Sequence, residues 1–344
     1  MAAAALALAL AACGKESGPS EFNPQGTSAD VAAAQGAFAS EQTSSFAAVS
    51  ADISTALSGS PVVASSAAMA LTKLSGTSAR YARQLASLVP KAGRGLQASA
   101  SAMPSALLGT TFVWDEANDE YVPSDESGAP SSGVRFVLYA VDPVLLRPVE
   151  PVVEVGYVDV IDQSTETTVD VRVKVVEGNV VYLDYDVTAI ATAVGGVVTV
   201  DGYASNGSTV ANFTLKNTIS QNDSGLVMSL DYDLTVPSRD VAVNWTATFA
   251  NISENEVVVT LDLSISGSNG AVRLLGTYGA NGGSFTVKVN GDPFATVTLN
   301  GGNADITGAG GEPLTADEEA SLQAILSYFD TSLGVFTELM LPIV

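Results

Sequence analysis

The sequence predicts a mainly β protein of the α+β class, in which a large curved antiparallel meander, a half-barrel or barrel of about a dozen strands, packs on helices. Three observations lead to this fold. Apolar and polar residues alternate with hardly a break from Gly156 to Ile306, as in strands with one buried and one solvated face. Pairs of Asn and Gly, which favour tight turns, interrupt that stretch at short intervals. Apolar residues at helical spacing lie before and after it.

The alternating stretch is long enough to constrain the architecture. Val169, Val171, Val173 and Val175 alternate with charged residues, and the same period of two continues to Phe285 and beyond. Open sheets of more than about ten strands curl or split, and a ring of about twelve strands leaves interior room that a ring of about eight fills. We therefore expect other apolar side chains on the concave side. A membrane-spanning barrel is the alternative architecture, and the aromatic content of 7% argues against it.

The C-terminal segment, residues 312–344, is predicted to supply the helix that fills this space. Thr315 and Glu318 have the spacing of a capping box. An apolar stripe at helical spacing follows: Leu322, Ile325, Leu326, Phe329, Leu333 and Phe336. We expect this helix to pack on a sheet domain that covers residues 109–311. The alternatives for the interface are a core packed by protein alone and a ligand cavity, whose expected lining is Trp245, Phe249, Leu230, Leu261, Leu326 and Phe329.

Residues 29–108 are rich in Ala and Ser and are predicted to be helical. The apolar residues from Val31 to Leu57 fall mostly on one narrow face of a single long helix. Ser60-Pro61 supplies the start of a second helix, and a third is expected from Thr77 to Val89. Because alanine-lined stripes bury little surface, these helices need the sheet or one another for stability.

The segment from Thr110 to Asp125 predicts two short strands joined by an acidic loop. Its carboxylates from Asp115 to Glu120 are close enough in sequence to hold Ca²⁺, which takes about six to eight oxygen ligands, but they lack the order of an EF-hand loop. A solvated hairpin tip is the simpler interpretation. The proline-rich segment from Pro143 to Pro151 is expected to be an extended crossover and not a central strand.

The charge balance excludes one broad class of partner. The chain has 14 Lys and Arg against 37 Asp and Glu, which gives a formal net charge of -23. Such a surface repels DNA and RNA, so nucleic-acid binding is not expected.

Few residues are candidates for catalysis. The chain contains no His and a single Cys, which excludes His-based triads and His-ligated zinc or iron centres. Carboxylate pairs of the glycosidase type remain, and Asp184 with Asp186, Asp231 with Asp233, and Asp262 lie on polar faces of predicted strands. A solvated sheet face explains them more simply. We expect no enzyme and no cofactor; the alternatives are an acidic surface or structural protein with weak Ca²⁺ association and a carboxylate-dependent hydrolase.

A short apolar run near the start of the chain leads into Leu10-Ala11-Ala12-Cys13. This stretch resembles the lipobox signal peptide of bacterial lipoproteins, although no Lys or Arg precedes the apolar run. The resemblance implies that residues 1–12 are a signal peptide, that Cys13 carries acyl chains such as palmitate, and that residues 13–28 form the tether. Gly14 is similar to the second mature residue of lipoproteins sent to the outer membrane. At about 0.8 kcal/mol per buried methylene, two or three acyl chains make a stable anchor.

The predicted plan also resembles the half-barrel of the periplasmic lipoprotein carriers and their outer-membrane receptor, in architecture and lipid anchor only. No motif of that family matches residue by residue. These observations predict a lipid-anchored protein of the bacterial cell envelope with a non-catalytic binding or structural role. Its expected partners are the membrane, through Cys13, and a hydrophobic ligand or another envelope protein.

Overall fold

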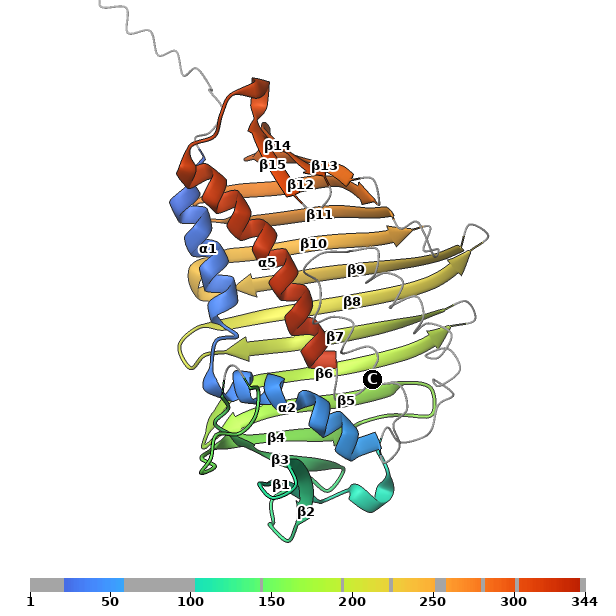
Figure 1. Cartoon of the computed structure of the whole chain (residues 1–344). Coiled ribbons are helices and arrows are strands. Elements are labelled where there is room, and N and C mark those ends of the chain that lie inside the picture. Colours follow the sequence, from blue (N-terminus) through green and yellow to red (C-terminus); the bar gives the residue numbers. More distant parts are fainter. Residues whose placement is uncertain are drawn as a thin grey trace, which may run out of the picture.

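The computed structural model describes residues 22–58, 103–142, 145–192, 195–222, 225–250, 258–279, 282–300 and 303–340. Within them, 15 strands form one sheet (Figure 1). The strands are β1 (Thr111–Asp115), β2 (Glu120–Ser124), β3 (Gly133–Tyr139), β4 (Glu154–Asp162), β5 (Val169–Glu177), β6 (Val180–Thr192), β7 (Gly195–Ser205), β8 (Val210–Asn222), β9 (Gly225–Val236), β10 (Val241–Ala250), β11 (Val258–Gly267), β12 (Gly270–Gly279), β13 (Gly282–Val289), β14 (Asp292–Asn300) and β15 (Asn303–Gly308).

The sheet is an open antiparallel meander. Each strand from β3 to β15 pairs with the next in sequence, and β1 and β2 follow β3 at the far edge. The β1–β2 hairpin joins the sheet through a short parallel pairing of β1 with β3. The predicted α+β, mainly β fold is confirmed, and the strand number exceeds the expected dozen partly because this hairpin belongs to the same sheet.

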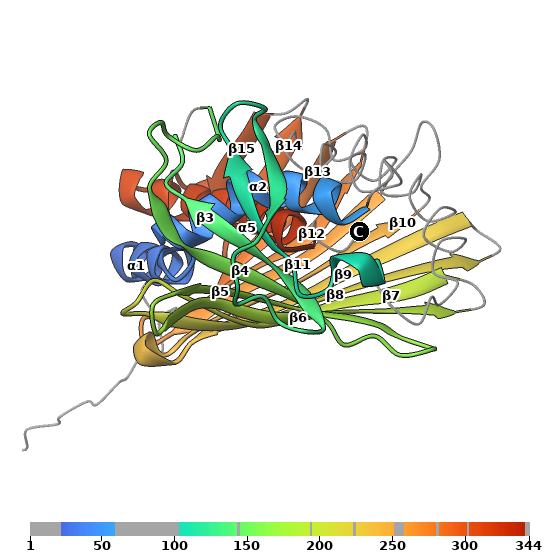
Figure 2. The same cartoon turned by 90° about the horizontal axis from the view of Figure 1, so that it is seen from below.

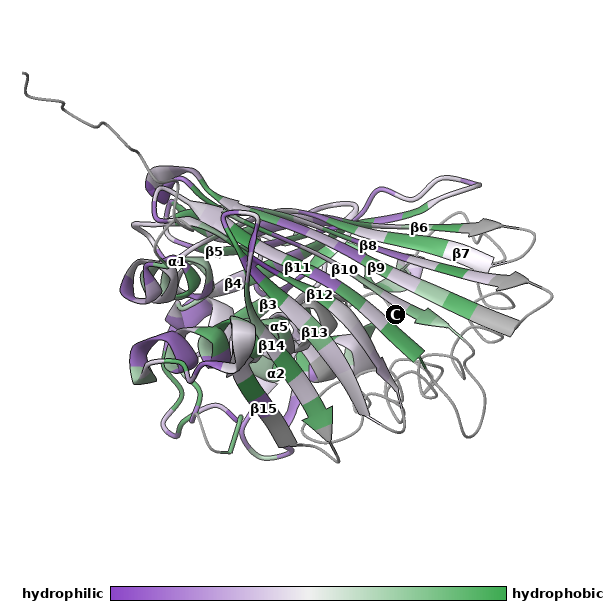
Figure 3. Cartoon of the chain, turned by 90° about the horizontal axis from the view of Figure 1, so that it is seen from above, coloured by the Kyte–Doolittle hydropathy of each residue, from purple (hydrophilic) through white to green (hydrophobic). Residues whose placement is uncertain are grey.

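The period of two in the sequence assigns each strand a buried and a solvated face. In β10, Val243, Trp245 and Ala247 are buried while Thr246 between them is exposed. Apolar and polar bands alternate along the strands in the same way in Figure 3. At the predicted turn Asn290-Gly291 both residues have positive φ, 51° and 97°, which matches the right-handed twist of the flanking strands.

In the described part of the chain, three helices lie on the concave face of the sheet (Figure 2). They are α1 (Pro24–Gly36), α2 (Glu41–Ser58) and α5 (Ala316–Met340). Short 3-10 turns are η1 (Ser105–Leu107), η2 (Pro237–Arg239) and η3 (Ala309–Gly311). Helices α1 and α5 run side by side across β9 to β11, and α2 crosses β3 to β6. In the described part of the chain, no helix combines the length and apolar character needed to cross a membrane.

The expectation of one long helix from Val31 to Leu57 is wrong, because the chain turns between α1 and α2. Gly36 ends α1, and its carbonyl accepts a hydrogen bond of 2.7 Å from the Asn206 side chain. The Ser40 hydroxyl then accepts from the Thr43 N–H at 3.0 Å and caps α2. The turn places Phe38 against the sheet, where its ring lies 5.6 Å from that of Phe213.

The start of α1 differs from the predicted tether as well. Residues 24–28, assigned to the tether, form the first turn of α1, because the Asn23 side chain caps Gly26 and Pro24 occupies the first helical position. The Asn269 amide on the β11–β12 turn donates to buried Asp30 at 3.2 Å and 3.3 Å. This contact fixes the N-terminal half of α1 on the sheet.

Helix α5 begins with the predicted capping box. The Thr315 N–H donates to the Glu318 carboxylate at 2.7 Å, and the Glu318 N–H donates to the Thr315 hydroxyl at 3.3 Å. Further along the helix, the Phe329 ring meets the indole of Trp245 edge-on at 5.1 Å. The helix is thus held at its start by its own cap and along its length by the sheet.

The segment from Pro143 to Pro151 is not the extended crossover that its prolines suggest. The chain doubles back on itself: Val141 bridges to Pro148, and the Asp142 N–H donates to the Arg147 carbonyl at 2.9 Å. At the tip Leu146 has a φ of 52° and is 59% exposed. Exposed apolar side chains gather on this loop: Leu145, Leu146, Val149 and Val153.

Several predictions concern residues outside the described ones. They are the signal peptide at residues 1–12, lipidation of Cys13, the first part of the tether, and the two helices expected from Ser60 to Val89. They stay predictions from sequence.

Replacing Leu146 with Asn should stabilise the protein. A left-handed backbone costs an ordinary L-residue about 1–2 kcal/mol, and Asn tolerates it far better. Because the leucine side chain is mostly exposed, little burial is lost. We expect Leu146→Asn to raise the free energy of unfolding in urea by about 0.5–1 kcal/mol. The same change at Val149, an exposed residue of this loop that is not among the residues with positive φ, should shift it by less than about 0.5 kcal/mol; equal effects at both positions would contradict the strain argument.

Candidate functional site

Two cavities in the described part of the chain lie where the helices meet, the first among α2, α5 and the turn before α2, and the second among α1, α5 and Tyr232 of β9. The first, here called the α2 cavity, has a volume of about 130 Å³ and is lined by Phe38, Thr43, Ser44, Phe46, Ala47, Val335 and Leu339. The second, the tyrosine cavity, has a volume of about 50 Å³ and is lined by Ala34, Gln35, Phe38, Tyr232, Tyr328, Thr331, Ser332 and Val335. Phe38 and Val335 line both cavities, which therefore adjoin each other and are together called the cleft.

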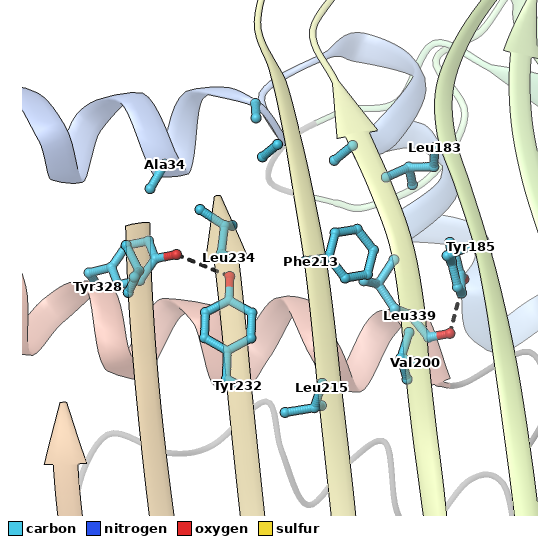
Figure 4. Close-up of a cluster of buried hydrophobic side chains, with 14 of the residues drawn as sticks. Ala34, Leu183, Tyr185, Val200, Phe213, Leu215, Tyr232, Leu234, Tyr328 and Leu339 are labelled. Carbon is cyan, nitrogen blue, oxygen red and sulfur yellow. Dashed lines mark hydrogen bonds between the residues drawn. The ribbon is translucent and has the colours of Figure 1, made fainter. Parts of the chain in front are cut away.

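The cleft exists because the chain turns between α1 and α2. That turn carries Phe38 to the junction of the two cavities, and α2 then contributes Phe46 and Ala47 to one wall. The C-terminal half of α5 supplies the opposite wall through Val335 and Leu339. The α5 backbone is held here by the Tyr185 hydroxyl of β6, which donates to the Leu339 carbonyl at 2.9 Å (Figure 4).

The tyrosine cavity contains a buried pair of hydroxyl groups. The hydroxyls of Tyr232 on β9 and Tyr328 on α5 lie 3.1 Å apart and share a hydrogen bond in which either can donate (Figure 4). Both side chains are almost fully buried, with exposures of 2% and 3%. Burial raises the pKa of Tyr328 to about 12 and that of Tyr232 well above its usual value. Both hydroxyls are therefore uncharged at neutral pH.

Among the described side chains that line the cleft, none is charged. An ion transferred to such a site loses its hydration and finds no counter-charge, which is strongly unfavourable. An apolar group gains about 25 cal/mol for each Å² removed from water. The lining therefore favours an uncharged, mostly apolar occupant.

None of the six residues predicted to line a ligand cavity lines the cleft. Trp245, Phe249, Leu230 and Leu261 are all buried in the sheet face, between 2% and 4% exposed. Leu326 and Phe329 pack on that face from α5. Of the six, only Trp245 lines any of the described cavities, and that cavity opens on the other side of the sheet. In the structure these residues pack between the sheet and α5, and none of them lines the cleft.

The solvated face of the sheet carries the predicted carboxylates. A shallow depression of about 280 Å³ there is lined by Asp231, Tyr232, Asp233, Asn244, Trp245, Thr246, Asp262, Ser264 and Arg273. The Thr246 hydroxyl donates to Asp231 at 3.0 Å, and the Arg273 guanidinium pairs with Asp262 through two hydrogen bonds. The carboxylates of this depression are thus largely engaged by their neighbours on the sheet.

The two predicted carboxylate pairs are not brought together. Asp184 and Asp186 are on β6 and Asp231 and Asp233 are on β9, with β7 and β8 between them. Arg172 pairs with Asp184 at 2.7 Å and 2.8 Å. Burial, together with the charges of nearby aspartates, raises the pKa of Asp186. In the described part of the chain, no three or more His, Cys, Asp or Glu side chains form a group suited to a metal ion.

The sequence contains one signal for the cleft, which the prediction of a single long helix overlooked. Gly36 and Ser40 are a helix-ending residue and a helix-capping residue four positions apart. They divide the apolar stripe from Val31 to Leu57 into two helices, and the turn between these helices carries Phe38.

The buried hydroxyl pair predicts a loss of stability at alkaline pH. An unfolded tyrosine ionises near pH 10, whereas Tyr328 in the folded chain ionises at about 12. Between these values the unfolded state loses the proton first, so the free energy of unfolding falls as pH rises, by up to ~1.4 kcal/mol per pH unit for each such tyrosine. Urea unfolding at pH 9, 10 and 11 should therefore show a shallower fall for Tyr328→Phe than for wild type. Parallel curves would show that Tyr328 does not contribute.

Comparison of the chain with family models, with curated proteins and with solved structures finds no match. The resemblance to lipoproteins and their carriers therefore remains a prediction from sequence and architecture. The function has to be argued from the cleft itself.

Proposed function

We propose that this chain is a non-catalytic, lipid-anchored protein of the bacterial cell envelope that binds a hydrophobic ligand between its sheet and its helices. The observation that carries the proposal is the apolar cleft among α1, α2, α5 and Tyr232 of β9, whose described lining is uncharged. The proposed binding site is formed by other residues than those expected from the sequence.

The volume of the cleft limits the ligand. An apolar cavity of about 150 Å³ in a protein core binds benzene, and the α2 cavity, at about 130 Å³, is close to that size. The tyrosine cavity adds about 50 Å³ beyond Phe38 and Val335. The cleft therefore suits a small aromatic or aliphatic group, or one end of a longer acyl chain.

Lipid anchoring through Cys13 is the second part of the proposal, and the lipobox resemblance supports it. Cys13 is the only cysteine of the chain, so acyl transfer to a thiol has a single target. Anchoring would hold the cleft near a membrane, where the concentration of apolar ligands is highest.

Toluene is a suitable probe of the cleft, because its ring matches the α2 cavity and it carries no polar group. We expect toluene to raise the melting temperature of the wild-type chain, by the linkage that stabilises any folded state that binds a ligand. Ala47→Leu fills the α2 cavity and should abolish the shift. Ala32→Leu makes the same change on the exposed side of α1 and should leave the shift intact. The proposal fails if wild type shows no shift, or if Ala47→Leu responds as fully as Ala32→Leu.

Labelling with radioactive palmitate tests the anchor separately. In bacteria that express the full chain, we expect label in the wild-type protein and in the membrane fraction. Cys13→Ala should carry no label and should leave that fraction, since it lacks the acyl chains that hold it there. Label retained by Cys13→Ala would show that the lipobox interpretation is wrong.

A further inference from the structure

One face of α5 lines both cavities of the cleft. Tyr328, Thr331 and Ser332 line the tyrosine cavity, whereas Leu339 lines the α2 cavity. Val335 lines both. Residues three, four and seven positions apart share a face of a helix, and at a rise of 1.5 Å per residue the interval from Tyr328 to Leu339 covers about 16 Å. The two cavities therefore follow each other along α5, and Val335 lies between them.

Phe38 is the second residue that lines both cavities. It comes from the turn between α1 and α2, and its ring lies 5.6 Å from that of Phe213 on β8. This contact holds the ring against the sheet. Side chains that are shared by the walls of two distinct, adjoining cavities separate those cavities. Val335 and Phe38 therefore form a partition between the α2 cavity and the tyrosine cavity.

The part of α5 that carries the partition is held on both sides. The hydroxyls of Tyr232 and Tyr328 share a hydrogen bond of 3.1 Å, seven residues before Val335 (Figure 4). The Tyr185 hydroxyl donates to the Leu339 carbonyl at 2.9 Å, four residues after it. The side chain itself is also stiff, because valine has one strongly preferred rotamer in a helix. The partition is therefore a fixed feature of the cleft.

Building on the proposed function, we propose that Val335 determines the length of the ligand that the cleft accepts. The α2 cavity, at about 130 Å³, receives one compact uncharged group about the size of an aromatic ring. A substituent that extends from this group toward the tyrosine cavity meets Val335 and Phe38. A long substituent that points the other way stays in solvent and gains no burial. The cleft therefore binds rings with long alkyl substituents no better than rings with short ones.

Toluene and n-butylbenzene test this limit, because the second carries three more methylenes on the same ring. Each buried methylene strengthens binding about fourfold. Calorimetry on the full wild-type chain should show a difference between the two probes that is smaller than the contribution of one methylene. Val335→Ala removes two methyl groups from the partition and joins the cavities. In this variant n-butylbenzene should bind at least about fourfold more tightly than toluene.

Val49→Ala is the matched control. It removes the same two methyl groups from a buried side chain of α2 that lines neither of the two described cavities, so it should behave like wild type. In the Val335→Ala background, Ala34→Val narrows the tyrosine cavity from α1. The preference for n-butylbenzene should then disappear while toluene still binds. Thr331→Ile narrows the same cavity from the exposed side of α5 and repeats this test if Ala34→Val does not fold.

The outcomes separate this inference from the proposed function. Toluene binding with the same preference in wild type and in Val335→Ala would overturn the inference and leave the cleft as an apolar site. A preference that also arises in Val49→Ala would overturn it as well, because the gain would then come from a general loosening of the core. So would a preference that survives narrowing of the tyrosine cavity. Absence of toluene binding in wild type would overturn the proposed function itself.

Discussion

The structure depends on covering one apolar sheet face. Fifteen strands of alternating sequence create a concave surface in which Trp245, Tyr185, Phe136 and their neighbours are fully buried. The sheet is open, so it cannot bury this surface by closing on itself. Helices α1 and α2 are rich in Ala and Ser, and isolated helices of this length have little stability of their own in water. Each layer therefore stabilises the other, and Phe329 against Trp245 is the central contact between them.

The cleft follows from how that cover is divided. Helices α1, α2 and α5 do not cover the curved sheet completely. Small side chains such as Ala34 and Ala47 leave space where these helices meet. An empty core cavity costs about 24 cal/mol per Å³. For the α2 cavity the cost is on the order of 3 kcal/mol at most, and less because part of its wall is exposed. An apolar ligand that fills the cavity would add packing contacts with its walls.

The sequence predicted the local features and missed those set by tertiary contacts. Strand periodicity, the Thr315 capping box and the Asn290-Gly291 turn depend on neighbouring residues, and the structure has all of them. The parallel pairing of β1 with β3 was not predicted, because nothing in either strand specifies its neighbour. The cavity was predicted at the centre of the sheet, where aromatic rings are largest. Large aromatic side chains fill the space at the centre of the sheet. The two cavities of the cleft lie beside Ala34 and Ala47, where the helices meet.

The convex face of the sheet and the cleft on its concave side differ in charge. The aspartates of β5 to β11 and their arginine partners project from the convex face, while the described side chains that line the cleft are uncharged. With a formal net charge of -23, the protein as a whole lowers the concentration of anions near its surface. Long-range repulsion and local desolvation therefore act in the same direction, since each disfavours an anionic ligand. A neutral ligand meets neither barrier, so the acidic surface can increase the selectivity of the cleft without contacting the ligand.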